Sequence, residues 1–191
     1  MLGRESFGFE IRRSSEGRYI MRVLGVDPGL TRCGVAVVEG APGRTLVPRH
    51  IGVLTTGADV DISRRLASIE RGILALVMEF EPDVIAIERV FSQHNVRSAM
   101  GTAQAAAMAL VIAGRLNLPV AMHTPTEVKA AITGSGRAQK AQVAAMVVRL
   151  LKLESAPRPT DAADAAAIAI CQIWRGTAQR RIDDAMAAIA R

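Results

Sequence analysis

Residues 24–38 read Leu-Gly-Val-Asp-Pro-Gly-Leu-Thr-Arg-Cys-Gly-Val-Ala-Val-Val, two apolar runs joined by a glycine-rich turn. The pattern predicts two short strands, and a strand that is apolar at nearly every position belongs in a sheet covered on both faces. Asp27 stands where the first strand ends, and Pro28 and Gly29 then turn the chain back. A carboxylate at such a strand exit can reach solvent or a metal ion, although Asp-Pro-Gly alone is also ordinary turn chemistry.

Three more carboxylates occupy comparable positions far along the chain. Glu88 ends another apolar run, and Asp161 and Asp164 open an alanine-rich helix. Residues three apart on a helix lie on one face, so both aspartates can point at the same place. Hard divalent cations such as Mg²⁺ or Mn²⁺ prefer oxygen ligands, and two such ions roughly 3.5–4 Å apart can clamp the attacking and leaving oxygens of a phosphodiester. Asp27, Glu88, Asp161 and Asp164 are therefore the candidate metal ligands and catalytic residues.

Each of these acids also has a purely structural alternative. Glu88 can simply close a strand, whereas Asp161 and Asp164 can cap a helix and interact with its dipole. For an isolated Asp-x-x-Asp the capping interpretation is the better one. Four such acids, two of them at the ends of buried strands, favour a shared acidic site over four unrelated structural roles.

The composition points to one basic domain with an aliphatic core. The chain has 191 residues, a formal net charge of +6 and only 3% aromatic residues, while half of its residues are hydrophobic. The length suits a single domain, and the charge favours a polyanionic partner. Lys129, Lys140 and Lys152 are the lysines of the sequence, and two of them fall near the glycine-rich turn at residues 133–136.

The cysteines and the N-terminal segment indicate in which cellular compartment the protein is expected. Cys33 and Cys171 lie far apart without metal-ligand spacing, so we expect reduced thiols of a cytoplasmic protein. The three histidines are scattered, which disfavours a zinc site, and no apolar run approaches the length of a membrane span. Residues 1–20 carry mixed charges and are not a signal peptide. We expect them to be a disordered extension, with Met21 as the natural start.

Hydrophobic periodicity predicts five strands and several helices. The expected strands are 22–27, 34–40, 47–55, 83–88 and 119–123, and the expected helices are 61–81, 96–116, 126–132, 139–152, 161–175 and a separate amphipathic helix at 177–190. A three-stranded meander followed by alternating helices and strands gives an α/β fold, a mixed sheet with helices on both faces. Asp27 and Glu88 would then end adjacent central strands. The predicted domain spans 21–175, and 176–191 form a helical tail.

Five motifs in order give the chain a family resemblance. They are Gly-Val-Asp27-Pro-Gly, Ala-Ile-Glu88-Arg-Val-Phe91, Gly101-Thr-Ala-Gln104, Val128-Lys129 with Thr133-Gly-Ser-Gly136 and Lys140, and Asp161-Ala-Ala-Asp164-Ala. From Met21 to about Trp174 the chain resembles the RuvC family of Holliday-junction resolvases. The resemblance implies a ribonuclease-H-like fold with a mixed five-stranded sheet, and paired symmetric nicking of junction DNA in recombination and repair.

The resemblance also implies roles for individual residues. Asp27, Glu88 and the two helix aspartates would form the acidic site for two Mg²⁺ or Mn²⁺ ions. Phe91 is similar to an aromatic residue that stacks on an unpaired base near the junction centre, and Lys129 and Lys140 to lysines near the scissile phosphate. The alternatives are a core position for Phe91 and a solvated helix face for the lysines. The implied partners are four-way junction DNA, a second copy of the chain and the RuvA–RuvB branch-migration complex, with no membrane.

A homodimer is also expected from the symmetry of the substrate. A four-way junction has near two-fold symmetry, and one acidic cluster per chain can cut only one strand. The helix at 96–116 is the candidate interface, because Ser98, Gly101, Ala105 and Ala109 would let two helices approach closely. Packing of the same small residues on the sheet is an equally good interpretation for part of this helix.

Three other functions share some of these features. A YqgF-like nuclease has the fold and an early Gly-x-Asp-x-Gly, but such chains are shorter and lack the blocks around Glu88 and Asp161. An actin-like or sugar-kinase ATP-binding domain needs a duplicated second domain, which this sequence does not supply. A non-catalytic junction-binding module would be expected to have lost acids, and none is missing here.

Overall fold

The computed structural model describes the backbone of residues 20–89 and 96–189 and the side chains of residues 20–89 and 99–176. Its strands are β1 (Met21–Asp27), β2 (Arg32–Gly40), β3 (Val47–Thr55), β4 (Val84–Glu88) and β5 (Val120–His123). Its helices are α1 (Ile62–Phe80), α2 (Val96–Arg115), α3 (Pro125–Thr133), α4 (Lys140–Leu151) and α5 (Thr160–Ile189). The predicted α/β class and the five strands are confirmed; four strands start one or two residues from the predicted position, and every strand ends where predicted.

The strands form one mixed sheet in the order β3-β2-β1-β4-β5. β1 runs antiparallel to β2, which runs antiparallel to β3, while β4 pairs parallel with β1 and β5 pairs parallel with β4. The carboxyl ends of β1, β4 and β5 therefore lie along one edge of the sheet. Asp27 and Glu88 end neighbouring central strands, as the sequence predicted.

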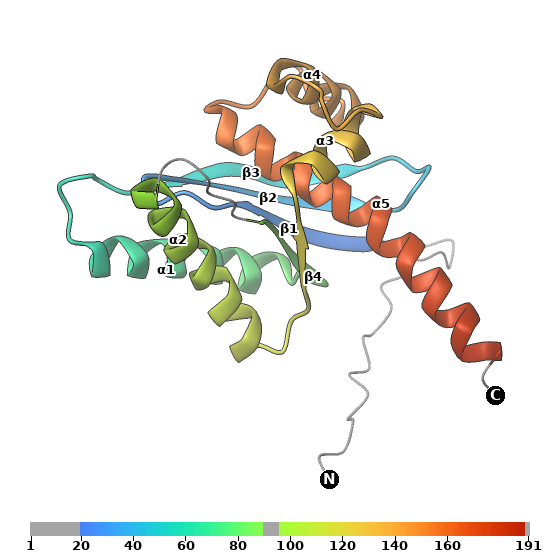
Figure 1. Cartoon of the computed structure of the whole chain (residues 1–191), viewed down its shortest axis with the longest axis horizontal. Coiled ribbons are helices and arrows are strands. Elements are labelled where there is room, and N and C mark those ends of the chain that lie inside the picture. Colours follow the sequence, from blue (N-terminus) through green and yellow to red (C-terminus); the bar gives the residue numbers. More distant parts are fainter. Residues whose placement is uncertain (1–19, 90–95, 190–191) are drawn as a thin grey trace, which may run out of the picture.

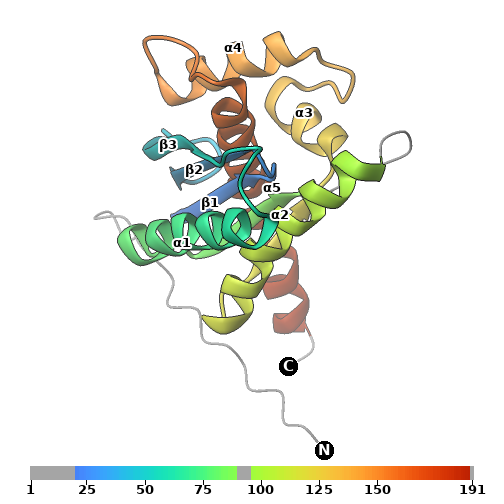
Figure 2. The ribbon, with the colours of Figure 1, turned by 90° about the vertical axis from the view of Figure 1, so that its left-hand side faces the viewer.

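Helices cover both faces of the sheet (Figures 1 and 2). α1 and α2 lie on one face, and α3, α4 and α5 lie on the other. The two faces of β1 divide the core accordingly: Leu24 and Val26 pack with α1 and α2, whereas Met21 and Val23 pack with α5. Because both faces of β1 are covered, a strand with nearly continuous apolar side chains is stable in the centre of the sheet.

Alanine and glycine bring α5 very close to the central strands. A Cβ atom on Gly25 would lie far inside van der Waals contact with the backbone carbonyl of Ala165 and 2.8 Å from the amide nitrogen of Ala169. Both alanines are fully buried. The absent side chain in β1 and the short side chains of α5 let the helix backbone rest directly on the sheet, which fixes the start of α5 relative to the strand ends.

The C-terminal part of the chain differs from the prediction. Two helices, 161–175 and 177–190, were expected, but α5 continues without interruption from Thr160 to Ile189. Gly176 suggests a break, because glycine is a poor helix former. In the structure a Cβ at this position would collide with the side chain of Gln172, one turn earlier, so Gly176 makes room within the helix.

Other sequence expectations lie partly outside the described residues. The N-terminal extension, except for residue 20, and Phe91 are not described. Cys33 and Cys171 are both buried free thiols, and burial raises the pKa of each to about 12. Among the helices that the structure describes, none combines the length and the apolar character needed to cross a membrane.

Candidate active site

Two of the predicted acids lie at the edge formed by the carboxyl ends of the parallel strands. Asp27 is the last residue of β1 and Glu88 is the last residue of β4. Side chains alternate along a strand, and Gly25 faces α5, so Asp27 projects toward the same helix. Both carboxylates are partly buried, so they combine a fixed position with access from outside.

The other two acids come from the first turns of α5. Asp161 and Asp164 are half-buried and lie on the side of the helix that meets the strand ends. A Cβ on Gly34 of β2 would overlap the backbone carbonyl of Asp161 and lie 3.2 Å from Cβ of Asp27. Gly34 pairs directly with Asp27 in the sheet. The structure thus brings all four predicted acids to one place, although they are separated by as many as 137 positions in sequence (164 minus 27).

Electrostatic repulsion links Asp27 to the other three acids. The pKa of Asp27 is raised to about 7, first by burial and then by repulsion from Glu88, Asp164 and Asp161. Burial, followed by the charge of Asp164, also raises the pKa of Glu88. Desolvation and neighbouring negative charge both disfavour ionisation. A positive ligand at this place would therefore relieve an unfavourable concentration of charge.

Basic side chains contact the two aspartates of α5. Nζ of Lys140 lies 3.3 Å from Oδ2 of Asp164, and Nε of Arg32 lies 3.2 Å from Oδ2 of Asp161. Lys140 also lowers the pKa of Asp27 and of Glu88 through its charge, and Lys129 lowers that of Glu88. Both lysines predicted from the sequence are therefore near the acids.

The donor set fits hard divalent cations. In the part of the chain that the structure describes, no three carboxylate, imidazole or thiol groups converge as ready-made ligands of one ion. Instead, Asp161 and Asp164 are each paired with a basic side chain. Oδ2 of Asp161 is nevertheless buried without a hydrogen-bond partner, a costly state for a carboxylate oxygen. The four side chains offer only oxygen ligands, and one of these oxygens accepts no hydrogen bond. Such a set of ligands suits Mg²⁺ or Mn²⁺ better than zinc.

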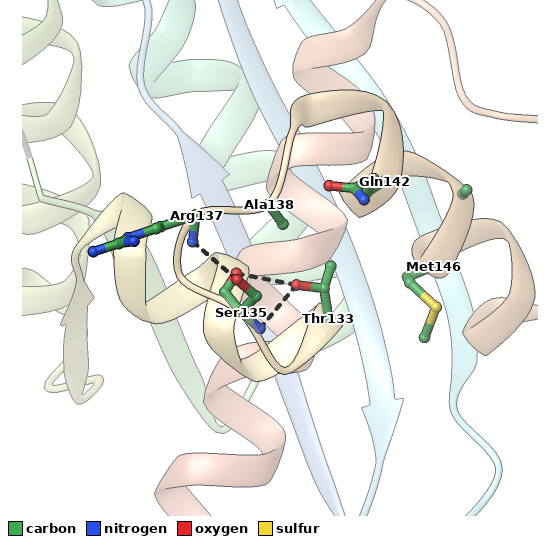
Figure 3. Close-up of a pocket in the computed structure, with 7 residues that line it drawn as sticks. Thr133, Ser135, Arg137, Ala138, Gln142 and Met146 are labelled. Carbon is green, nitrogen blue, oxygen red and sulfur yellow. Dashed lines mark hydrogen bonds between the residues drawn. The ribbon is translucent and has the colours of Figure 1, made fainter.

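The glycine-rich turn between α3 and α4, which precedes the helix that carries Lys140, is held by its own hydrogen bonds. The hydroxyl of Thr133 donates to the carbonyls of Lys129 and Ser135 and accepts from the backbone amide of Ser135, while the amide of Arg137 donates to the Ser135 hydroxyl. Gly134 adopts a left-handed conformation (φ 81°) that ends α3. Beside this turn lies an open hollow of about 450 Å³ (Figure 3). Its lining residues are Thr133, Ser135, Arg137, Ala138, Gln142, Ala145 and Met146.

The structure adds residues that the sequence did not single out. His123 ends β5 beside Glu88, and its Nε2 lies 2.8 Å from Oε1 of Gln172 on α5. Burial lowers the pKa of His123, so this buried contact is one between neutral groups at pH 7. Arg32 lies three residues beyond the Gly-Val-Asp27-Pro-Gly motif, but no periodicity or spacing relates it to Asp161. Only the packing of β2 against α5 reveals that pair.

The chain is similar to known proteins over most of its length. Residues 23–172 match the family model described as crossover junction endodeoxyribonuclease RuvC. The chain is 62% identical to the Streptomyces avermitilis protein of that name over 167 residues, which are 87% of this chain and 95% of the relative. The Thermobifida fusca protein is 60% identical over 90% of this chain and 94% of its own.

A solved structure shares the architecture. RuvC of T. thermophilus, determined in complex with a Holliday junction substrate, superposes with a TM-score of 0.78 at 33% identity. The match covers 82% of this chain and 94% of that one. The ribonuclease-H-like fold expected from the sequence is thereby confirmed. From the family model, the relatives and the fold together, the chain belongs to the RuvC family of crossover junction endodeoxyribonucleases.

Proposed function

We propose that this protein is a metal-dependent endonuclease that resolves four-way DNA junctions by hydrolysing phosphodiesters. The observation that carries the proposal is the gathering of Asp27, Glu88, Asp161 and Asp164 at one edge of the sheet, with Lys140 beside them. Relatives covering most of the chain are named crossover junction endodeoxyribonucleases, and a neighbour of the same fold was solved with a Holliday junction substrate. Carboxylates on two strands and one helix would supply the ligands for phosphodiester hydrolysis by two metal ions.

The acids would hold two Mg²⁺ or Mn²⁺ ions, with Asp27 central among them. When bound, the ions would activate a water molecule and neutralise charge on the leaving 3′ oxygen, giving 5′-phosphate and 3′-hydroxyl ends. The role of the protein is to place the ligands. β1 and β4 fix Asp27 and Glu88 by their pairing, while the contact between Gly34 and Asp161 holds the first turn of α5 against β2.

Basic side chains around the acids would position the substrate. Lys140 is 78% exposed while it contacts Asp164, so its ammonium group can also reach a phosphate oxygen beside the acids. Lys129 is close enough to affect Glu88 and would act on the same phosphate. Phe91 would stack on an unpaired base next to the cut, and base–aromatic stacking contributes roughly 1–3 kcal/mol. Binding to the DNA backbone should depend strongly on salt concentration, because each phosphate contact releases counterions.

A homodimer would supply the two matched cuts, but Ala105 and Ala109, two of the small residues named from the sequence, are not available for its contact. Ala105 and Ala109 are fully buried in the core between α2 and the sheet, so they face their own domain. The side chain of Ser98 lies outside the described residues. The exposed face of α2 instead carries larger apolar side chains, among them Met100 and Val111. We assign the dimer contact to this face. Association with RuvA–RuvB and a cytoplasmic location remain expectations from the family resemblance.

The proposed activity is tested with Asp27→Asn on a synthetic four-way junction and on linear duplex DNA. The substitution removes a metal-binding charge without altering the basic surface. Cleavage with Mg²⁺ or Mn²⁺ should fall at least about 1000-fold, since metal ions supply several kcal/mol of transition-state stabilisation, whereas junction binding in EDTA should persist. Asp59→Asn, in an exposed loop, makes the same chemical change as a control. Comparable nicking by Asp27→Asn and wild type would contradict the assignment.

A further inference from the structure

Arg32 is a basic side chain placed against one of the four acids by the sheet itself. It is the first residue of β2, and its Nε lies 3.2 Å from Oδ2 of Asp161. The Arg32 side chain is 59% exposed, whereas that of Asp161 is 22% exposed. The cation thus approaches from the solvent side and meets the carboxylate at the surface of the acidic site.

The contact is an ion pair without a directed hydrogen bond. Oδ2 of Asp161 is buried and has no hydrogen-bond partner, although the guanidinium of Arg32 is within 4 Å. The guanidinium and the carboxylate still attract each other, but the lone pairs of Oδ2 accept no hydrogen bond. An oxygen in this state retains the capacity to bind a cation that offers stronger coordination. The pair therefore neutralises the carboxylate without satisfying it.

Hydrogen bonds fix the backbone next to Arg32, whereas its guanidinium group is exposed. The amide of Thr56 donates to the carbonyl of Thr31 at 3.0 Å, and its hydroxyl donates to the carbonyl of Leu30 at 2.6 Å. Arg65 of α1 donates through Nε to the Thr56 hydroxyl and through Nη2 to the Thr31 hydroxyl, both at 2.8 Å. This network fixes the turn from which Arg32 projects, and leaves a long, exposed side chain that can change partners.

Lys140 does not duplicate the role of Arg32. The two basic residues come from different layers of the fold, β2 and α4, and approach different aspartates of α5. Lys140 acts on Asp164, Asp27 and Glu88 together, while Arg32 contacts Asp161 at the rim. Removing Arg32 would therefore change the electrostatics of one ligand and leave the other basic contact in place.

We propose that Arg32 is a positioning residue that holds Asp161 in the metal-free site and competes with a divalent ion for this carboxylate. The inference rests on the proposed metal-dependent function. The pair keeps the first turn of α5 and the start of β2 together before metal arrives. A divalent ion, with twice the charge and direct oxygen coordination, then displaces the exposed guanidinium. Arg32 thereby raises the dissociation constant of the site for the divalent ion.

The test is calorimetric titration of Mn²⁺ into the full-length protein without DNA. Arg32→Gln keeps a polar side chain but removes the charge. The dissociation constant for Mn²⁺ should then fall roughly threefold to tenfold, the range expected for loss of one partly exposed charge. Arg32→Lys retains a cation and should return the constant toward the wild-type value. Arg44→Gln makes the same charge change in the exposed turn beyond the opposite end of β2 and should leave the constant unchanged. Thermal unfolding of each variant checks that the fold is retained.

The outcomes separate this inference from the proposed function. If the wild type binds Mn²⁺ and Arg32→Gln binds it with equal or lower affinity, competition by Arg32 is overturned while the metal site stands. A constant for Arg32→Lys that matches Arg32→Gln would equally exclude a charge-based role. If the wild type binds no Mn²⁺ and cleaves junctions without metal, both the inference and the proposed metal chemistry are wrong.

Discussion

Gly34 of β2 lies directly against the backbone carbonyl of Asp161, so closely that a Cβ atom on the glycine would overlap that oxygen. The same glycine pairs with Asp27 across the sheet. One position without a side chain thus fixes the separation between the strand that ends in Asp27 and the helix turn that carries Asp161. The geometry of the acidic site depends on this contact as much as on the acids themselves.

Gly34→Ala should abolish cleavage and destabilise the fold. The added methyl group can be accommodated only if α5 moves away from β2, because the atom it meets is backbone; overpacking of this kind costs about 3 kcal/mol or more in free energy of unfolding. Chemical denaturation and junction cleavage measure the two effects. Gly114→Ala is the control, since a Cβ there meets nothing within 4 Å, and alanine should stabilise that helix position slightly. Wild-type activity of Gly34→Ala would refute the argument.

The raised pKa of Asp27 predicts that the metal-free protein loses stability as pH increases. The pKa of this carboxyl is about 7 in the folded state and 3.8 in a model peptide, so between these values the folded state binds more protons than the unfolded state. The free energy of unfolding must then fall as pH rises through that window. Asp27→Asn removes the effect and should be more stable than wild type by about 1–3 kcal/mol at pH 8, with little difference at pH 4.

Thermal unfolding in EDTA at a series of pH values measures this difference. Saturating Mn²⁺ should stabilise the wild type at pH 8 more than it stabilises Asp27→Asn. Asp27 is mostly ionised at this pH, and a bound cation offsets a buried negative charge that asparagine does not have. The prediction would be contradicted by a wild type that is more stable than Asp27→Asn at pH 8 in EDTA.

Lys140→Gln should move the pH dependence of cleavage toward higher pH. Lys140 lowers the pKa of Asp27 and of Glu88, so its loss raises both, and protons then compete more strongly with metal for the acids. At pH 7 and subsaturating Mg²⁺, kcat/KM should fall at least about tenfold, within the range seen when a charged group at a site is removed. The shift is measured on the acidic side of the plot of kcat/KM against pH. Lys152→Gln, at the exposed C-terminal end of the same helix, should leave the profile unchanged.

Val111→Arg should convert the proposed dimer to monomers. Val111 is 41% exposed on α2, and a charge there would be buried between two helices in the dimer. Sedimentation should give a monomer at micromolar concentration, with single nicks in place of paired ones. Val47→Arg makes the same change at a similarly exposed residue of β3, away from α2, and is the control. A wild type that stays monomeric on junction DNA would refute the dimer itself.

Much of the architecture follows from local sequence. The continuous apolar runs before Asp27 and Glu88 indicate strands covered on both faces, and each run is buried as that pattern requires. The helical period around Ile69 and Ile73, followed by Pro82, placed α1 within a residue of its observed end. These features are readable because side-chain burial in a strand or helix repeats with a fixed period along the chain.

The pattern of small residues in α2 could not be interpreted from the sequence alone. Alanines at positions 105 and 109 share one helix face, and such a face can meet a second chain or the sheet of its own domain. In the structure both are fully buried within the domain. Periodicity identifies which residues lie together on a face, but only the tertiary packing determines what that face contacts.

The sequence by itself identified the four candidate acids. It also predicted the two strands that end in Asp27 and Glu88 and the helix that carries Asp161 and Asp164 on one face. Only the tertiary structure decided that Arg32 meets Asp161, that Lys140 meets Asp164, and that α5 runs unbroken past Gly176. These pairs join residues 129 and 24 positions apart (161 minus 32 and 164 minus 140) on different elements. No local period relates such residues, because their distance is set by how closely a helix backbone packs on a sheet at glycine and alanine positions.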